Sequence, residues 1–142
     1  MKNHILALRG KSSVGKSSTL QLLYKLLVTN PNTKTLYFEA VGRKLDFLAI
    51  VVIEGVIVGL FNRGDAPATV QDMLERLVNE KCQVIVCAAR TKGEVDNVLK
   101  SYGGKYEVST LQKTANIGKS EAVSNLAAAH NLASMVYAAI DA

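Results

Sequence analysis

A short apolar run, a loop of small residues and an amphipathic helix follow one another near the start of the chain. Ile5–Leu8 is an unbroken apolar run, typical of a strand buried on both faces of a parallel sheet. Residues 10–15 are mostly small and include two glycines. Over Lys16–Val28 the apolar residues recur at helical spacing, at Leu20, Leu23 and Leu27, with Leu22 and Leu26 widening the stripe. A buried strand that leads through a tight loop into a helix predicts an α/β fold.

The same alternation of strand and helix patterns continues along the chain. Strands are expected at residues 5–8, 35–38, 47–53, 56–61, 84–87 and 106–111. Helices are expected at residues 16–28 and 119–140, and two more are expected between the later strands, one beginning at Pro67 and a short one running to Ser101. The two-residue loop Glu54-Gly55 joins two β-branched runs, which indicates an antiparallel hairpin. We therefore predict a three-layer α/β sandwich with a mainly parallel sheet of five or six strands and an antiparallel hairpin at 47–61.

Composition limits the alternatives to this fold. The chain has 142 residues, 49% of them hydrophobic and 20% charged, which excludes intrinsic disorder and predicts one domain over residues 1–142. Two cysteines are too few for a disulfide scaffold, and neither has zinc-site spacing to a histidine. The longest apolar tract, at residues 47–61, is broken by a polar turn and is too short for a membrane helix. A cytoplasmic protein with no membrane partner is expected.

The net charge is +5, from 17 basic and 12 acidic residues. Such an excess favours anionic partners. The basic residues are scattered and form no run, so a mildly basic solvated surface is favoured over a nucleic-acid face.

The loop has the form G-x-x-x-x-G-K-S, in which Gly10 and Gly15 precede Lys16 and Ser17. This pattern resembles the Walker A motif of the P-loop NTPase superfamily. Glycines let a backbone wrap closely around phosphate oxygens, and successive N–H groups then form an anion-binding nest at a helix N-terminus. The resemblance implies that Lys16 reaches the β- and γ-phosphates and that the Ser17 hydroxyl binds magnesium. The nucleotide-binding residues it implies are Gly10, Lys11, Ser12, Ser13, Val14, Gly15, Lys16, Ser17 and Ser18.

The same resemblance implies an acidic residue that holds magnesium, directly or through water, after another core strand. Asp65 follows the strand expected at 56–61, although it also sits where the N-cap of the helix at Pro67 belongs. Glu39, at the end of the preceding strand, is the competing candidate. The candidate catalytic residues are thus Lys16, Asp65 and Glu39, and the candidate metal ligands are Ser17 and Asp65.

Two branches of the superfamily are similar in different ways. The element order resembles small GTPases, but Gly64-Asp65 reverses the order of their Asp-x-x-Gly turn. Residues 88–93 also lack their guanine-reading Asn-Lys-x-Asp, so ATP is expected rather than GTP. Similarity to small-molecule kinases implies a substrate-binding acid or arginine after the second strand, for which the candidates are Glu39, Arg43 and Asp46. Arg90 or Lys119 would then clamp phosphate or substrate.

The sequence therefore predicts a magnesium-dependent ATP-binding protein that hydrolyses the nucleotide or transfers its phosphoryl group. The alternatives are a small-metabolite kinase and a non-enzymatic nucleotide-dependent switch or interaction module. Either would add a small-molecule or protein partner to the nucleotide.

Overall fold

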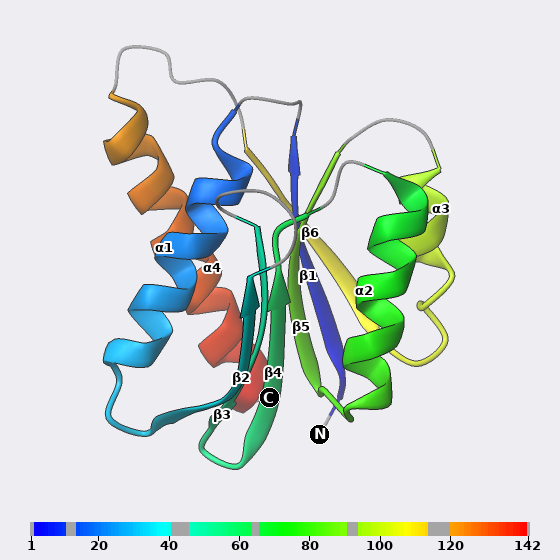
Figure 1. The fold of residues 1–142 in the computed structure, drawn as a ribbon, viewed down its shortest axis with the longest axis horizontal. Coiled ribbons are helices and arrows are strands. Elements are labelled where there is room, and N and C mark those ends of the chain that lie inside the picture. The colour runs from blue at the N-terminus through cyan, green and yellow to red at the C-terminus, as the bar shows by residue number, and fades with distance from the viewer. Residues whose placement is uncertain are drawn as a thin grey trace.

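A computed structural model describes residues 2–10, 14–40, 46–63, 66–90, 94–113 and 120–141 (Figure 1). Within them, strands alternate with helices except in the middle of the chain, where three strands follow one another. The strands are β1 (His4–Gly10), β2 (Thr33–Ala40), β3 (Phe47–Ile53), β4 (Val56–Phe61), β5 (Val84–Arg90) and β6 (Glu107–Gln112). The helices are α1 (Lys16–Thr29), α2 (Pro67–Asn79), α3 (Val95–Lys100) and α4 (Glu121–Asp141). None of these helices is long and apolar enough to cross a bilayer.

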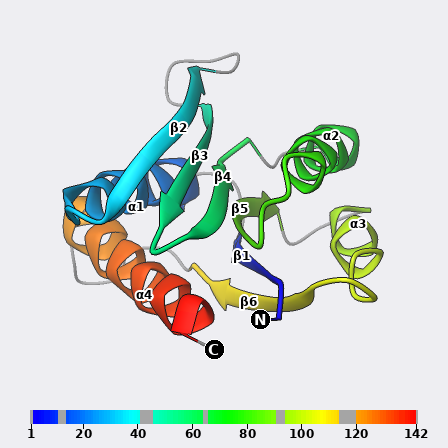
Figure 2. The ribbon, with the colours of Figure 1, turned by 90° about the horizontal axis from the view of Figure 1, so that it is seen from below.

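The six strands form one mixed sheet in the order β2-β3-β4-β5-β1-β6. The pairs β4-β5, β5-β1 and β1-β6 are parallel, whereas β2-β3 and β3-β4 are antiparallel. Figure 2 shows α1 and α4 on one face of the sheet and α2 and α3 on the other. The prediction of an α/β architecture with a mainly parallel sheet of five or six strands is confirmed, with six strands in the described chain.

The hairpin at residues 47–61 is confirmed with the predicted bounds. Its turn residues, Glu54 and Gly55, have φ values of 51° and 81°, and two positive φ values match the right-handed twist of the flanking strands. Other elements are longer than predicted: β2 extends over Thr33–Ala40 and β5 over Val84–Arg90. Local patterns define element centres better than element ends.

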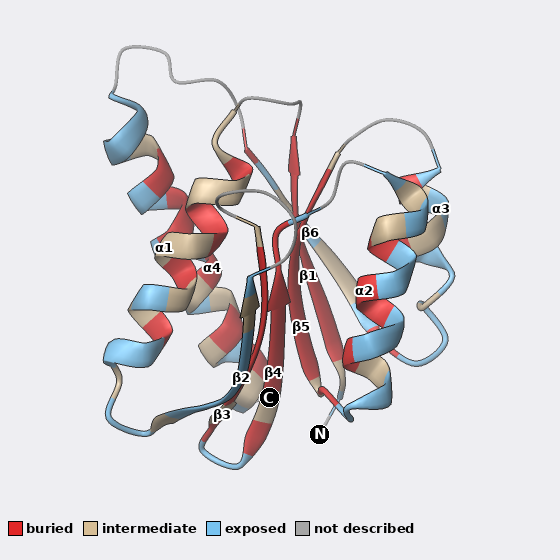
Figure 3. Ribbon diagram, in the orientation of Figure 1, coloured by how far each residue is buried: buried red, intermediate tan, exposed pale blue. Residues whose placement is uncertain are grey.

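Two apolar clusters hold the sheet between its helices, as the buried residues in Figure 3 show. One lies under α1 and α4 and includes Leu8, Leu23, Val51 and Leu132. The other lies under α2 and α3 and includes Ile5, Phe61, Leu74, Cys87 and Leu99. Alternate residues of β1 enter the two clusters, and all seven of its residues are buried. The unbroken apolar run at residues 5–8 therefore reflects a strand covered on both faces.

Strands β1, β4, β5 and β6 point the same way, so their carboxyl ends meet at one edge of the sheet, the upper edge in Figure 1. Ligands of open α/β sheets bind outside this kind of edge. Strand β1 lies between β5 and β6 and leads directly towards α1. The fold thus places Gly10 and Gly15, the described ends of the glycine-containing connection, at the edge of the sheet outside which open α/β folds bind ligands.

Candidate functional site

The candidate site lies where β1 ends and α1 begins. Gly10 is the last residue of β1, and Gly15 precedes the first residue of α1, Lys16. Gly15 has φ 92° and ψ 21°, a left-handed conformation that glycine adopts without the steric cost of a Cβ atom. Lys11, Ser12 and Ser13 lie outside the described residues.

The Lys16 side chain folds back across this connection. Its Nζ donates a hydrogen bond to the carbonyl oxygen of Gly10 at 2.8 Å. Only 8% of Lys16 is exposed, so a positive charge is held in a largely desolvated position between the strand end and the helix start. A buried ammonium needs anionic or carbonyl oxygens around it, and phosphate oxygens satisfy the same requirement.

Both glycines of the connection are packed against the end of β6 and the start of α4. A Cβ atom on Gly10 would lie 2.6 Å from the carbonyl oxygen of Lys113, and one on Gly15 would lie 2.2 Å from Oδ1 of Asn125. Real Cβ atoms do not approach other atoms so closely. The two glycines are therefore required by tertiary packing as well as by the conformation of the loop.

Lys113 and Asn125 form the other wall of the site. The Lys113 backbone N–H donates to the Arg9 carbonyl oxygen at 2.7 Å, and Lys113 Nζ donates to Ser124 Oγ at 3.0 Å. Lys113 is 4% exposed, and burial lowers the pKa of its ammonium. Asn125 is also 4% exposed, and its Oδ1 has no hydrogen-bond partner among the described atoms. Neither residue stood out in the sequence, because nothing local marks a residue that packs against a distant loop.

The first turn of α1 contains no acidic residue, and no described side chain caps it. The positive end of the helix dipole is therefore not neutralised by a carboxylate at this point. The Thr19 hydroxyl donates to the Gly15 carbonyl oxygen at 2.7 Å, which keeps this hydroxyl within the helix. Ser17 and Ser18 are half-buried.

Asn62, directly after β4, ties the neighbouring elements to this helix. Its Nδ2 donates to the Ser17 carbonyl oxygen at 3.2 Å, and its Oδ1 accepts from the Phe47 backbone N–H at 2.9 Å. Asn62 is 3% exposed, so both contacts are made away from water. The structure thus makes Asn62 a link between the hairpin and α1, a role that no motif in the sequence indicated.

Arg9 organises the opposite side of β1. Its guanidinium donates to the Arg90 carbonyl oxygen at 2.8 and 3.2 Å and to an oxygen of Asp96 in α3 at 2.9 Å. The hydrogen bond from Arg9 is the main reason that the pKa of Asp96 is below its usual range, and Lys100 adds to it. Arg90 thus contributes a backbone carbonyl to a structural clamp at the end of β5.

Glu39 lies away from the loop, on the edge strand β2. Four strand spacings, or about 19 Å, separate β2 from β1 across the sheet. Its carboxylate accepts from both terminal nitrogens of Arg76 in α2, at 3.2 and 3.3 Å, and from the Tyr37 hydroxyl. The bonds from Arg76, then Tyr37, lower the pKa of Glu39. The structure therefore does not bring Glu39 together with Lys16, and it gives Glu39 a role in joining β2 to α2.

Several of the predicted residues fall outside the described part of the chain. These are Lys11, Ser12, Ser13, Arg43, Gly64, Asp65 and Lys119. Asp46 is described and half-buried, directly before β3. Among the described residues, no group of three or more His, Cys, Asp or Glu side chains could hold a metal ion. A magnesium ion at this site would accordingly depend on the Ser17 hydroxyl, on Asp65 and on ligand oxygens.

A cavity of about 630 Å³ adjoins the site between α1 and α4. Ser18 and Asn125 line the part nearest the loop, and Gln21, Lys25 and Glu121 supply further polar side chains. Its volume is in the range of small-molecule sites, and polar groups come from both helices.

Comparisons with known proteins give no family assignment. No protein-family model and no curated protein matches the chain. A solved structure of EndoMS in its apo form aligns with 65% of this chain and 45% of its own, at 21% sequence identity and a TM-score of 0.39. A similarity of this strength says nothing about function.

Proposed function

We propose that this protein binds a nucleoside triphosphate, ATP rather than GTP, with Mg²⁺, and that it hydrolyses the nucleotide or transfers its γ-phosphoryl group. The observation that carries this proposal is the buried Lys16 ammonium, bonded to Gly10 across a glycine-containing connection between a strand and a helix. The G-x-x-x-x-G-K-S pattern of the sequence supports the same interpretation.

The chemistry of the site suits a polyphosphate. Lys16 supplies a positive charge in a desolvated position, where electrostatic attraction to phosphate oxygens is stronger than in water. The N-terminus of α1 adds its dipole, and its first turn carries no acid that would repel an anion. The Ser17 hydroxyl and Asp65 would hold the magnesium ion, which neutralises charge on the phosphates. Catalysis would rest on positioning and charge neutralisation and not on a covalent intermediate.

The cavity between α1 and α4 is our candidate for the nucleoside part of the ligand. It begins at Ser18, next to the phosphate-binding connection, and it offers amide side chains from Gln21 and Asn125. Amide groups can donate to and accept from the edge of a purine base. A nucleoside bound in this cavity would contact α4, the helix that also packs against Gly15.

Calorimetric titration with ATP and GTP, each with and without Mg²⁺, tests the proposal. A charge-assisted hydrogen bond contributes about 1.5–3 kcal/mol, so Lys16→Ala should weaken ATP binding by about 10- to 150-fold. Lys105→Ala is the matched control, because Lys105 is an exposed lysine before β6 and lines neither the connection between β1 and α1 nor the cavity between α1 and α4. Circular dichroism would show whether each variant remains folded. If neither nucleotide binds the wild-type chain at millimolar concentration, the proposal fails.

Turnover then separates the alternatives. An NTPase would release phosphate from ATP without an acceptor, whereas a phosphotransferase would consume ATP only when its acceptor is present. A non-enzymatic switch would bind nucleotide with negligible turnover under both conditions. Preference for GTP by a wide margin would contradict the choice of ATP.

A further inference from the structure

The outer edge of the sheet is formed by β2 and is unusually apolar for an exposed strand. Leu36 is 55% exposed, Tyr37 42% and Phe38 51%. The outer side of β2 pairs with no other strand of the described chain, because β2 is the edge strand of the sheet. Exposed apolar edge strands are templates for pairing with another strand, and proteins usually protect them with charges or bulges or by covering them.

A bulge makes the pattern of this edge unusual. The register between β2 and β3 shifts between Thr35 and Tyr37, so Leu36 is an extra residue. Leu36 and Tyr37 consequently line the same groove, of about 580 Å³, against α2, although they are neighbours in sequence. In a regular strand they would point to opposite faces of the sheet.

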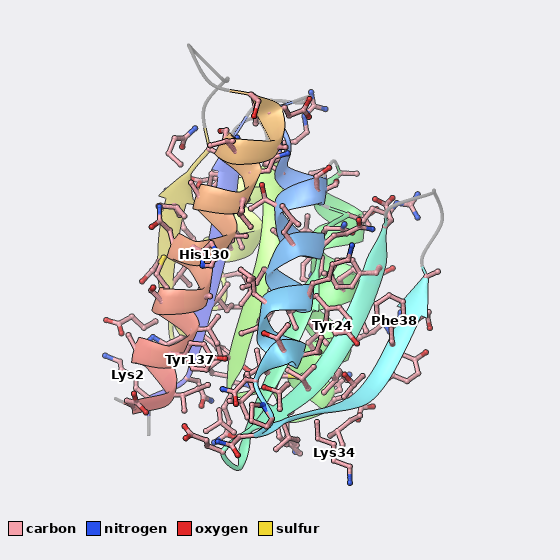
Figure 4. All side chains as sticks on the ribbon, turned by 90° about the vertical axis from the view of Figure 1, so that its left-hand side faces the viewer. Lys2, Tyr24, Lys34, Phe38, His130 and Tyr137 are labelled. Atoms are coloured by element: carbon pink, nitrogen blue, oxygen red, sulfur yellow. The ribbon has the colours of Figure 1, made fainter. Side chains whose placement is uncertain are left out.

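The contacts of the other β2 residues define which face each side chain occupies. Glu39 pairs with Arg76 of α2, so it is on the α2 face. Lys34 lies opposite Val52 of β3, whose two neighbours belong to the cluster under α1 and α4, so Val52 and Lys34 are on the α2 face as well. Thr35 bonds to the Tyr24 hydroxyl of α1, and the Phe38 ring lies 5.2 Å from the Tyr24 ring, so both are on the α1 face. Figure 4 shows Tyr24 of α1 beside Phe38 of β2, and Lys34 at the lower end of the view with its side chain extending away from the molecule.

Read from Thr33 to Ala40, the faces are symmetrical about the point between Leu36 and Tyr37. The outermost residues, Thr33 and Ala40, lie opposite Ile53 and Phe47, which belong to the cluster under α1 and α4. Moving inward, the next two residues are on the α2 face, the next two on the α1 face and the central two on the α2 face. A two-fold axis perpendicular to the sheet joins two antiparallel strands and keeps each face on its own side.

We propose that the edge of β2 is a homodimer interface, in which β2 of a second copy pairs antiparallel with it around this two-fold axis. Leu36 of each copy then lies opposite Tyr37 of the other, Thr35 opposite Phe38, and Lys34 opposite Glu39. Every facing pair shares one face of a continuous sheet of two joined copies. Without the bulge, this register would place every facing pair on opposite faces.

Charge and apolar surface both favour a second copy over an unrelated strand. The pairing brings Lys34 next to a Glu39 carboxylate twice, once on each side of the axis, and opposite charges in facing cross-strand positions attract. The same pairing removes Leu36 and Tyr37 from water by placing them against the same residues of the other copy. It also extends the groove under α2 from one copy into the other.

Sedimentation velocity over a range of concentrations tests the interface. The wild-type chain should form a dimer, and Leu36→Asp should abolish it. Lys34→Glu and Glu39→Lys should each weaken dimerisation at least tenfold, because each creates two like-charged pairs across the axis. Lys25→Glu is the matched control, since this exposed lysine of α1 lies outside β2. Circular dichroism on each variant separates loss of dimer from loss of fold.

The decisive measurement mixes Lys34→Glu with Glu39→Lys in equal amounts. In a heterodimer of these two variants both facing pairs are again oppositely charged, so the mixture should dimerise at least tenfold more tightly than either variant alone. A mixture that stays monomeric would overturn the proposal. So would a wild-type dimer that Leu36→Asp leaves intact. A wild-type chain that is monomeric at millimolar concentration would also overturn it and would leave the edge to a strand from a different protein.

Discussion

Replacing Gly15 by alanine should destabilise this protein through two separable effects. The first is conformational, because Gly15 has φ 92° and an L-residue in the left-handed region costs about 1–2 kcal/mol. The second is steric, because the new Cβ atom would lie 2.2 Å from Oδ1 of Asn125, which is buried in α4. Forcing extra volume into a packed site typically costs about 1–3 kcal/mol. The expected loss in free energy of unfolding is therefore about 2–5 kcal/mol.

The chain contains a matched control for the conformational effect. Gly55, in the hairpin turn, has φ 81°, and a Cβ atom there would meet nothing within 4 Å. Gly55→Ala should therefore show only the cost of the positive φ, about 1–2 kcal/mol. The difference between the two variants measures the contact between the loop and α4.

Urea unfolding followed by circular dichroism provides the measurement. With a slope of about 2 kcal/mol per molar urea, the Gly15→Ala midpoint should fall by about 1–2.5 M. Asn125→Ala removes the clashing atoms, so the double variant Gly15→Ala/Asn125→Ala should lose only the conformational term relative to Asn125→Ala. The coupling between the two sites should then be about 1–3 kcal/mol. The reasoning is refuted if Gly15→Ala costs no more than Gly55→Ala, or if the two substitutions are additive.

Two further predictions concern ionisable groups. Because Arg9 and Lys100 hold the pKa of Asp96 below its usual range, Asp96 ionises more readily in the folded state; its contribution to stability is present above the unfolded pKa and is lost as the pH falls below about 4. Asp96→Asn should accordingly flatten the acid limb of a stability profile measured by urea unfolding, and an unchanged limb would contradict the Arg9 clamp. Burial raises the pKa of both Cys82 and Cys87 to about 12, so neither thiol should react with an aromatic disulfide at pH 8 until urea unfolds the chain. Rapid labelling of the native protein would contradict the burial of both thiols in the cluster under α2 and α3.

Local patterns in the sequence predicted which segments of the chain form strands and which form helices. The hairpin at residues 47–61 could be predicted because its two β-branched runs and its turn are adjacent in the chain. The helix from Pro67 could be predicted because proline suits a first helical turn, and α2 begins there. The extension of β2 to Ala40 was missed because pairing with β3, and not composition, keeps those residues extended.

The residues of the candidate site also fall into those that local sequence predicts and those that only long-range contacts determine. The connection from Gly10 to Lys16 is contiguous, so its residue types alone predicted a phosphate-binding loop. Glu39 was a candidate because it closes a strand, but the position of that strand at the far edge of the sheet is a long-range property. Asn62 and Asn125 could not be predicted from the sequence, because each contacts a residue that is distant along the chain.

The sequence by itself determined that this is an α/β chain with a glycine-containing connection between a buried strand and a helix. Those features follow from the period of apolar residues and from the conformational freedom of glycine, which are both local. Only the tertiary structure decided that β5 lies between β4 and β1, that α4 closes on Gly15, and that a bulge makes the outer edge of β2 symmetrical. Strand order and close packing depend on contacts between segments that no local pattern relates, so they are fixed only when the whole core assembles.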